Sequence, residues 1–171
     1  QRNLSYMVKF FNFKEIVFVN TFDINVEGVT YVPTEPISYM QYNKWCLHNM
    51  INYVNTDFAL SFQDDGWPLN PECWRNEFFQ YDYVGAPITA DRGVLVKEEM
   101  IGGGGFTLRS RNLLKFTSTL PYEPDASGHY SNEDTAIVIK HRKGSRGTGN
   151  YLIETSDQFE AFIHYHRNNL S

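Results

Sequence analysis

Short apolar runs alternate along the chain with segments whose apolar residues follow helical spacing. Residues 15–20, 29–32 and 58–62 are apolar runs, rich in β-branched or aromatic side chains, with the length of buried strands. From Ser38 to Tyr53, apolar residues recur every three or four positions, which predicts a helix with Ser38 as its N-cap. Strands alternating with helices predict an α/β fold with a mainly parallel central sheet.

The second half of the chain continues this alternation. Residues 83–87, 106–109 and 151–153 are further predicted strands, Ser110 begins a helix, and residues 131–134 open another. Because no repeat, linker or low-complexity segment interrupts the pattern, we expect a single domain over residues 1–171.

Composition narrows the classes of partner. Fifteen Lys and Arg against 20 Asp and Glu give a formal net charge of −5, which argues against nucleic acid and anionic membranes as partners. Aromatic residues make up 16% of the chain, as in an ordered domain, and Tyr and Trp suit flat ligands with polar edges, such as sugars and nucleotides. Two isolated cysteines and the lack of an apolar stretch of about 20 residues predict a soluble, cytoplasmic domain without a transmembrane segment.

An acidic turn follows the strand at residues 58–62. Gln63, Asp64, Asp65 and Gly66 stand at its carboxyl end, where open α/β sheets bind their ligands. Adjacent carboxylates there can hold a divalent cation, although alternation along the chain leaves only one of them as a direct ligand. The alternative is a solvated turn, because Asp-Gly is common in turns.

Four consecutive glycines, residues 102–105, predict a break in regular structure, since glycine weakens helix and strand interiors. The run either lets the backbone approach a ligand closely or forms a flexible hairpin. It matches neither the dinucleotide-binding glycine motif nor the phosphate loop, so a nucleotide kinase or classical dinucleotide enzyme is disfavoured.

Two further clusters leave their roles open. Ser131 and Asp134 have the spacing of a helix capping box, yet Glu133 or Asp134 could equally act as a general base. His164 and His166 are either structural or metal ligands. The basic residues between 140 and 146 suit a solvated helix end better than a diphosphate clamp.

Taken together, several motifs between about residue 40 and residue 135 resemble a family of glycosyltransferase-like domains catalogued largely as a domain of unknown function. The motifs are FQDDGWPLNP (62–71), YDYVGAP (81–87), IGGGGFTLRS (101–110) and NED (132–134). The family is similar to GT-A glycosyltransferases, which have a single Rossmann-like domain. Those folds begin with a strand that carries the loop gripping the nucleotide base. Residues 6–13 resemble the helix after that strand, so we expect the first strand to be lacking.

The resemblance implies a set of donor and metal residues. Asp65 would bind Mn²⁺ or Mg²⁺, and His164, with His166 as the alternative, would complete the metal site. Gln63, Asp64 and Gly66 would contact the nucleotide-sugar donor, with Gln63 standing where the usual motif has an Asp.

The resemblance also implies which residues face the sugars and which perform the reaction. Asp134 would be the base and Glu133 would orient the acceptor. The sugar-facing positions would be Trp67, Gly103, Gly104, Gly105, Phe106 and Arg109.

The expected function is a metal-assisted, inverting transfer of sugar from a nucleotide-sugar donor, preferably UDP-linked, to the hydroxyl of a glycan or other acceptor. Such a transfer needs positive charge on the leaving diphosphate and a carboxylate to deprotonate the acceptor. The main alternative is a GT-A-like module that binds a nucleotide or glycan without turnover. A metal-dependent hydrolase using Asp65 and His164 ranks lower, because no tight cluster of ligands accompanies them.

Overall fold

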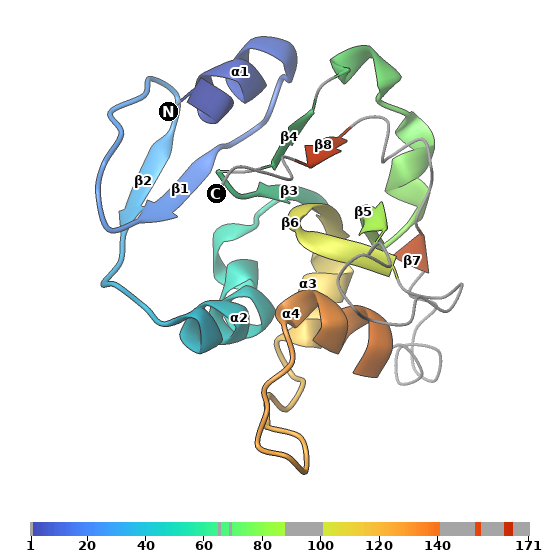
Figure 1. Cartoon of the computed structure of the whole chain (residues 1–171). Helices are drawn as coiled ribbons and strands as arrows, with labels where there is room; N and C mark the ends of the chain where they lie inside the picture. The colour runs from blue at the N-terminus through green and yellow to red at the C-terminus, as the bar shows by residue number, and fades with distance from the viewer. Residues whose placement is uncertain are drawn as a thin grey trace, which may run out of the picture.

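A computed structural model of the chain describes residues 2–64, 66–68, 70–87, 101–140, 153–154 and 163–165. Within these ranges, side chains are described for residues 4–64, 66, 68, 70–85 and 103–138. The elements form a mixed α/β arrangement of three small sheets with helices around them (Figure 1).

The N-terminal part is a helix followed by two parallel strands. Helix α1 (Arg2–Phe10) leads through residues 11–16 into β1 (Val17–Asn20), which pairs in parallel with β2 (Thr30–Pro33). The two strands predicted from apolar runs are confirmed, with boundaries shifted by one or two residues.

The helix predicted after Ser38 is confirmed in its first part. Helix α2 (Tyr39–His48) begins with a complete capping box: the Ser38 hydroxyl accepts from the backbone of Gln41, and the Gln41 side chain accepts from the backbone of Ser38. At Asn49 the chain leaves the α-helix and continues as a 3-10 turn, η1 (Met50–Tyr53). Apolar spacing extends across both pieces, so spacing alone did not predict this break.

Four strands form the largest sheet. Its order is β3 (Phe58–Phe62), β6 (Ile101–Ser110), β5 (Tyr83–Pro87) and β7 (Ile153–Glu154). Strand β6 is antiparallel to both of its neighbours, whereas β5 and β7 are parallel. Three of the four strands therefore run in one direction and β6 runs against them. The α/β class is confirmed, but a mainly parallel central sheet is not, because two of the three pairings are antiparallel.

The four glycines lie inside β6, so the predicted break at residues 102–105 is wrong. Gly103 pairs with Ala86 of β5, and the carbonyl of Gly105 accepts from the backbone of Gln63 just after β3. Backbone hydrogen bonds to strands on both sides offset the weak strand preference of glycine. The pairing with β5 is irregular here, with register shifts on both sides of Ala86.

A third, two-stranded sheet lies against the glycine half of β6. Strand β4 (Gly66–Pro68) pairs antiparallel with β8 (Ile163–Tyr165). The approach of β4 to β6 requires glycine: a Cβ at residue 66 would lie 2.8 Å from the carbonyl oxygen of Gly105. After β4, two short 3-10 turns, η2 (Pro71–Cys73) and η3 (Asn76–Gln80), lead to β5. Phe78 is buried there, whereas Phe79 is exposed.

Side chains of the central sheet alternate between two cores. Phe106 and Leu108 of β6 pack with Met7 of α1 and Phe78 on one face. On the other face Tyr83 of β5 packs with residues of α2, of α3 (Arg111–Thr117) and of the final helical segment. That segment is a short α-helix, α4 (Glu133–Thr135), continued as a π-helical turn, η5 (Ala136–Lys140). Because strand side chains alternate, Thr107 and Arg109 of β6 point to this second, helical face.

Two expectations from composition concern the described part of the chain. No described helix has the length and apolar character needed to cross a membrane. Cys46 is buried, Cys73 is half-buried, and neither forms a disulfide.

Replacing Ser38 tests the start of α2. Ser38→Ala removes the capping hydroxyl, and we expect it to lower the free energy of unfolding by about 1 kcal/mol in urea denaturation. Ser38→Asp keeps an acceptor at the N-cap and should lose little or nothing. Equal losses in the two variants would contradict the assigned cap.

Candidate functional site

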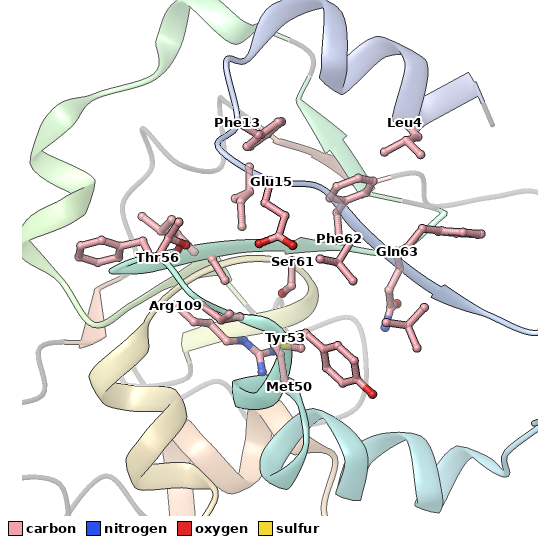
Figure 2. Close-up of a pocket in the computed structure, with 18 of the residues that line it drawn as sticks. Leu4, Phe13, Glu15, Met50, Tyr53, Thr56, Ser61, Phe62, Gln63 and Arg109 are labelled. Atoms are coloured by element: carbon pink, nitrogen blue, oxygen red, sulfur yellow. The ribbon is translucent and has the colours of Figure 1, made fainter. Parts of the chain in front are cut away.

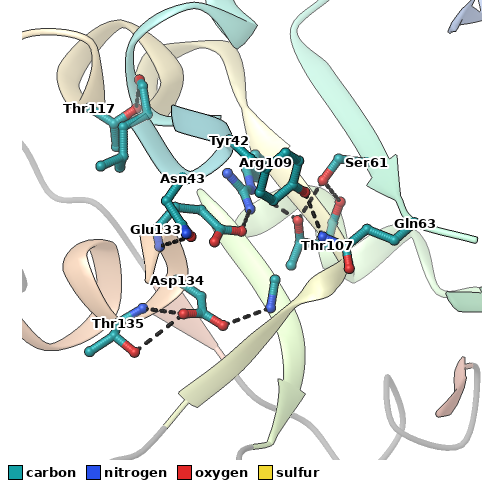
Figure 3. A network of polar contacts seen from close by, with 12 residues as sticks. Tyr42, Asn43, Ser61, Gln63, Thr107, Arg109, Thr117, Glu133, Asp134 and Thr135 are labelled. Atoms are coloured by element: carbon teal, nitrogen blue, oxygen red, sulfur yellow. Dashed lines mark hydrogen bonds and ion pairs between the residues drawn. The ribbon is translucent and has the colours of Figure 1, made fainter. Parts of the chain in front are cut away.

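Three segments that are distant in sequence meet at the glycine half of β6 (Figure 3). The backbone N–H of Gln63, just beyond β3, donates to the carbonyl of Gly105 at 2.8 Å. The neighbouring Gly104 donates its N–H to Oδ2 of Asp134 at 2.9 Å. The acidic turn, the glycine run and the Glu133–Asp134 pair are thus assembled at the carboxyl end of β3, where the sequence predicted a ligand crevice.

Asp134 holds the last helical segment to the sheet. One carboxylate oxygen accepts from Gly104, and the other accepts from the backbone N–H and the hydroxyl of Thr135. The N-cap of α4 is Asn132 and not Ser131, so the capping box suggested by Ser131 and Asp134 does not form. Asp134 is only half-buried, and its carboxylate therefore combines fixed orientation with access to solvent.

Glu133 takes the opposite position, inside the protein. Its side chain is 5% exposed, and Oε1 lies 3.2 Å from Nη2 of Arg109, whose side chain is 1% exposed. Its backbone N–H donates to the side-chain oxygen of Asn43 in α2 at 2.9 Å. The carboxylate lies directly beneath Gly104, where an added Cβ would come within 2.1 Å of Oε1. The expectation that Glu133 orients an acceptor does not fit, because its carboxylate is committed to a buried ion pair.

Arg109 lies at the centre of a polar cluster beneath the site. Its Nε donates to the Thr107 hydroxyl at 2.9 Å, and that hydroxyl lies 2.8 Å from the Ser61 hydroxyl. The guanidinium also lies 5.5 Å from the centroid of the Tyr83 ring. Burial works against the charge, but the electrostatic influence of Tyr83 and Glu133 outweighs it and raises the pKa of Arg109 above its usual value. Arg109 is therefore a permanent buried cation.

Two of the predicted sugar-facing side chains point elsewhere. Phe106 is 1% exposed and belongs to the core that contains Met7 and Leu108, so it presents no ring face to a sugar. Arg109 is equally buried and faces Glu133 on the helical side. Alternation along β6 explains both outcomes, because a strand covered on both faces buries every side chain. Gly103 and Gly104, by contrast, remain half-buried.

The side chain of Gln63 is held by α2. Its Nε2 donates to the Tyr42 hydroxyl, which also forms a hydrogen bond with the Cys46 thiol. Burial raises the pKa of the Tyr42 hydroxyl above its usual range and raises the pKa of Cys46 to about 11. Both groups are therefore neutral at physiological pH, and Gln63 lies in an uncharged setting.

Among the other residues predicted to contact the donor or the metal, the structure describes Asp64 and Gly66. Asp64 is exposed on the turn, and Gly66 is buried against β6. Asp65 and the side chain of Trp67 lie outside the described residues. That residues 63–66 bind a ligand, and do not merely form a solvated turn, therefore stays a prediction.

Of the two predicted metal ligands, Asp65 precedes β4 in the chain and His164 lies in β8. In the pairing of β4 with β8, Gly66 lies opposite Tyr165, and Trp67 opposite His164. This register brings the backbone of His164 close to the position that follows Asp65 in the chain. The side chains of Asp65, His164 and His166 are not among those described, and within the described residues no group of three or more His, Cys, Asp or Glu side chains is placed to hold a metal ion. The basic side chains of residues 140–146 also lie outside the description.

Sequence reasoning missed the polar residues that support Glu133 and Arg109. Asn43, Ser61 and Thr107 are small polar residues within apolar stretches, and Asn43 and Thr107 are buried. A signal was present in β6, where Thr107 and Arg109 alternate with Phe106 and Leu108. A polar residue at every second position of a buried strand indicates a polar cluster on one face.

Comparison with known protein families gives a match over most of the chain. The family model described as a protein of unknown function (DUF5672) matches residues 28–165. The chain belongs to this family. No curated protein and no solved structure shows a significant match to the chain. The part matched to DUF5672 runs from just before β2 to the end of β8 and includes every predicted site residue except His166, the alternative to His164.

Gly104 offers a direct test of the space that Glu133 occupies. Gly104→Ala places a methyl group against the Glu133 carboxylate, and we expect it to lower the free energy of unfolding by about 1–3 kcal/mol. In a Glu133→Asp background, where the carboxylate lies one methylene farther back, the same change should cost less than half as much. Equal costs in the two backgrounds, measured by urea denaturation, would contradict the placement of Glu133.

The raised pKa of Cys46 predicts a loss of stability at alkaline pH. The unfolded thiol loses its proton from about pH 9, whereas the folded thiol keeps it to about pH 11. Stability is therefore complete below pH 9 and falls as the pH rises toward 11, by about 2–3 kcal/mol for this group. Cys46→Ala removes this contribution, so urea denaturation at pH 8 and pH 11 should show a smaller loss in the variant. An equal loss in both proteins would exclude burial of the thiol as the cause.

Proposed function

We propose that this protein is a glycosyltransferase that moves a sugar from a nucleotide-sugar donor, preferably UDP-linked, to a hydroxyl acceptor. The observation that carries the proposal is the position of Asp134: a half-buried carboxylate, fixed on the backbone of Gly104, beside the acidic turn at the carboxyl end of β3. Catalysis by a positioned carboxylate requires a fixed orientation and access to the substrate, and Asp134 has both.

In the proposed reaction Asp134 is the base. It takes the proton of the acceptor hydroxyl while the acceptor oxygen bonds to the anomeric carbon and the bond from that carbon to the diphosphate breaks. This in-line displacement inverts the anomeric centre. The bare backbone of Gly103 and Gly104 leaves space for sugar rings beside the carboxylate, since glycine adds no side chain there.

The finer fold assignment is part of the same proposal. We infer a single Rossmann-like GT-A domain, whose donor site lies at the acidic turn and whose metal ligands are Asp65 and His164. Carboxylate and imidazole are suitable ligands for Mn²⁺, and the pairing of β4 with β8 supports their proximity. A bound cation would offset negative charge on the leaving diphosphate.

A second candidate is a nucleotide- or glycan-binding module without turnover. It is favoured by the engagement of two polar side chains at the site, since Gln63 is bonded to Tyr42 and Glu133 to Arg109. Such a module would use the same crevice to bind, with Asp134 serving only to join α4 to β6.

Asp134→Asn separates the two candidates. For a transferase, we expect the variant to reduce turnover of the accepted UDP-sugar by at least about 100-fold, because the amide cannot take a proton. The UDP affinity measured by calorimetry in the presence of Mn²⁺ should change little. The variant should stay folded with a modestly lower unfolding midpoint, because the amide oxygen can still accept from Gly104 whereas the amide NH2 cannot accept from the Thr135 N–H. Glu123→Gln, which neutralises an exposed carboxylate, is the matched control and should leave turnover unchanged.

The outcomes distinguish the hypotheses. Binding of UDP without turnover of any nucleotide sugar would favour the module. Full turnover by folded Asp134→Asn would eliminate the assigned base, and the absence of any nucleotide binding would exclude both candidates.

A further inference from the structure

Exposed aromatic side chains gather around the start of α4. Tyr39, the first residue of α2, is 66% exposed, and Tyr130, in the segment that leads into α4, is 42% exposed. One exposed ring on a protein surface is ordinary, whereas a group of them beside a candidate site indicates a binding surface. Together with the half-buried Tyr122 they form a group that we call the tyrosine rim.

The first member of the rim is fixed to α4 by Asn43. The buried side chain of Asn43 donates from Nδ2 to the carbonyl of Tyr39 at 2.8 Å, and its Oδ1 accepts from the backbone N–H of Glu133 at 2.9 Å. Figure 1 shows α2 beside α4, as these bonds require. Tyr39 is therefore held in a fixed position relative to the residue that precedes Asp134.

The other two members lie on the segment that enters α4. The Tyr122 hydroxyl donates to the carbonyl of Ser131 at 3.0 Å, and the ring centroids of Tyr122 and Tyr130 are 5.2 Å apart. Burial raises the pKa of the Tyr122 hydroxyl, and the electrostatic influence of Glu133 and Tyr39 adds to the rise. The two halves of the rim therefore lie within electrostatic range of each other, next to Glu133.

Tyr39 also borders the acidic turn. Its ring stacks on the ring of Tyr42, with centroids 6.4 Å apart and an interplanar angle of 22°. The Tyr42 hydroxyl in turn accepts from the side chain of Gln63. One exposed ring is thus connected through Tyr42 to the proposed donor site and through Asn43 to the residues beside the proposed base.

A surface of this kind suits the flat face of a neutral sugar. The C–H groups on one face of a pyranose ring carry partial positive charge, which favours the negative face of an aromatic ring. The phenol hydroxyls can form hydrogen bonds with the hydroxyls at the edge of the sugar. Asp134, next to the rim, is a half-buried carboxylate whose negative charge disfavours an anionic acceptor.

The largest cavity is a less suitable place for an acceptor (Figure 2). Its volume is about 1050 Å³, and its lining, which includes β1 and β3, is mostly apolar. A sugar would lose hydrogen bonds to water there without replacing most of them. Among the residues that the structure describes, Asp134 does not line this cavity, so an acceptor inside it would not meet the proposed base.

We propose that the tyrosine rim is the acceptor subsite and that it binds a neutral oligosaccharide, with sugar rings stacked on Tyr39 and Tyr130. This inference rests on the proposed function, because it takes Asp134 as the base and names the class of acceptor that this base deprotonates. The rim and the donor site then bind separate ligands, so a change in the rim weakens saccharide binding and leaves UDP binding as it was.

The test measures saccharide binding without requiring turnover. Calorimetry is carried out on the 171-residue chain and its variants with lactose, cellotriose and tri-N-acetylchitotriose as neutral probes, in the presence of UDP and Mn²⁺. We expect Tyr39→Ala and Tyr130→Ala each to lower the affinity for the bound probe by about tenfold, because each removes a stacking ring. Tyr39→Phe keeps the ring and should lose about threefold or less.

Phe10→Ala is the matched control, since it removes an exposed aromatic ring at the carboxyl end of α1. It should change neither saccharide affinity nor UDP affinity, and UDP affinity should also stay the same in the rim variants. Unfolding midpoints are measured for every variant to show that each remains folded.

The outcomes separate this inference from the proposed function. Binding of UDP but of none of the neutral saccharides would overturn the rim as an acceptor subsite. So would tighter binding of sialyllactose than of lactose, or a loss of UDP affinity in Tyr39→Ala, which would assign this ring to the donor base. Absence of UDP binding would instead remove the proposed function, while weaker saccharide binding in Tyr39→Ala would still support a glycan site at the rim.

Discussion

The buried ion pair between Arg109 and Glu133 is the interaction on which the candidate site depends. It joins the carboxyl end of β6 to the first residue of α4, and α4 in turn is bonded to α2 through Asn43. Removing two charges from water is costly, and the pair is stable only because other polar groups support it, namely Asn43 at the backbone of Glu133 and Thr107 at Nε of Arg109. Breaking one contact would leave a charge alone in the interior, so the cluster holds its members in a single arrangement. Asp134, the next residue along the chain, takes its position from this anchor.

The ion pair also explains why glycine is required above it. The Glu133 carboxylate fills the space that a side chain at residue 104 would need, and Gly66 likewise permits β4 to approach the backbone of β6. The surface at this point is therefore made of main chain, with the carboxylate of Asp134 beside it. The shape of this surface is set by the buried side chains beneath it, since its glycines have no side chains of their own.

Local chemistry made part of this fold predictable. Capping at Ser38 and Ser110 and the strands β3 and β5 depend on neighbouring residues, and their positions followed from the sequence. The glycine half of β6 did not, because glycine has no strand preference of its own and is held there by β3 and β5. The burial of Glu133 could not be predicted from neighbouring residues either, because a carboxylate at a helix start is normally solvated. Glu133 is buried because it pairs with Arg109, which is distant in sequence. The segments that carry the predicted site residues do lie together, but Phe106 and Arg109 are buried and do not face a sugar.

The open edges of β1 and β3 have a consequence for the behaviour of the chain in solution. Among the described strands, β1 pairs only with β2 and β3 only with β6. An unpaired edge beside apolar side chains pairs readily with a strand of another molecule. Self-association through these edges would increase with protein concentration. The tendency of this protein to self-associate is therefore tied to the order of its strands as well as to the composition of its surface.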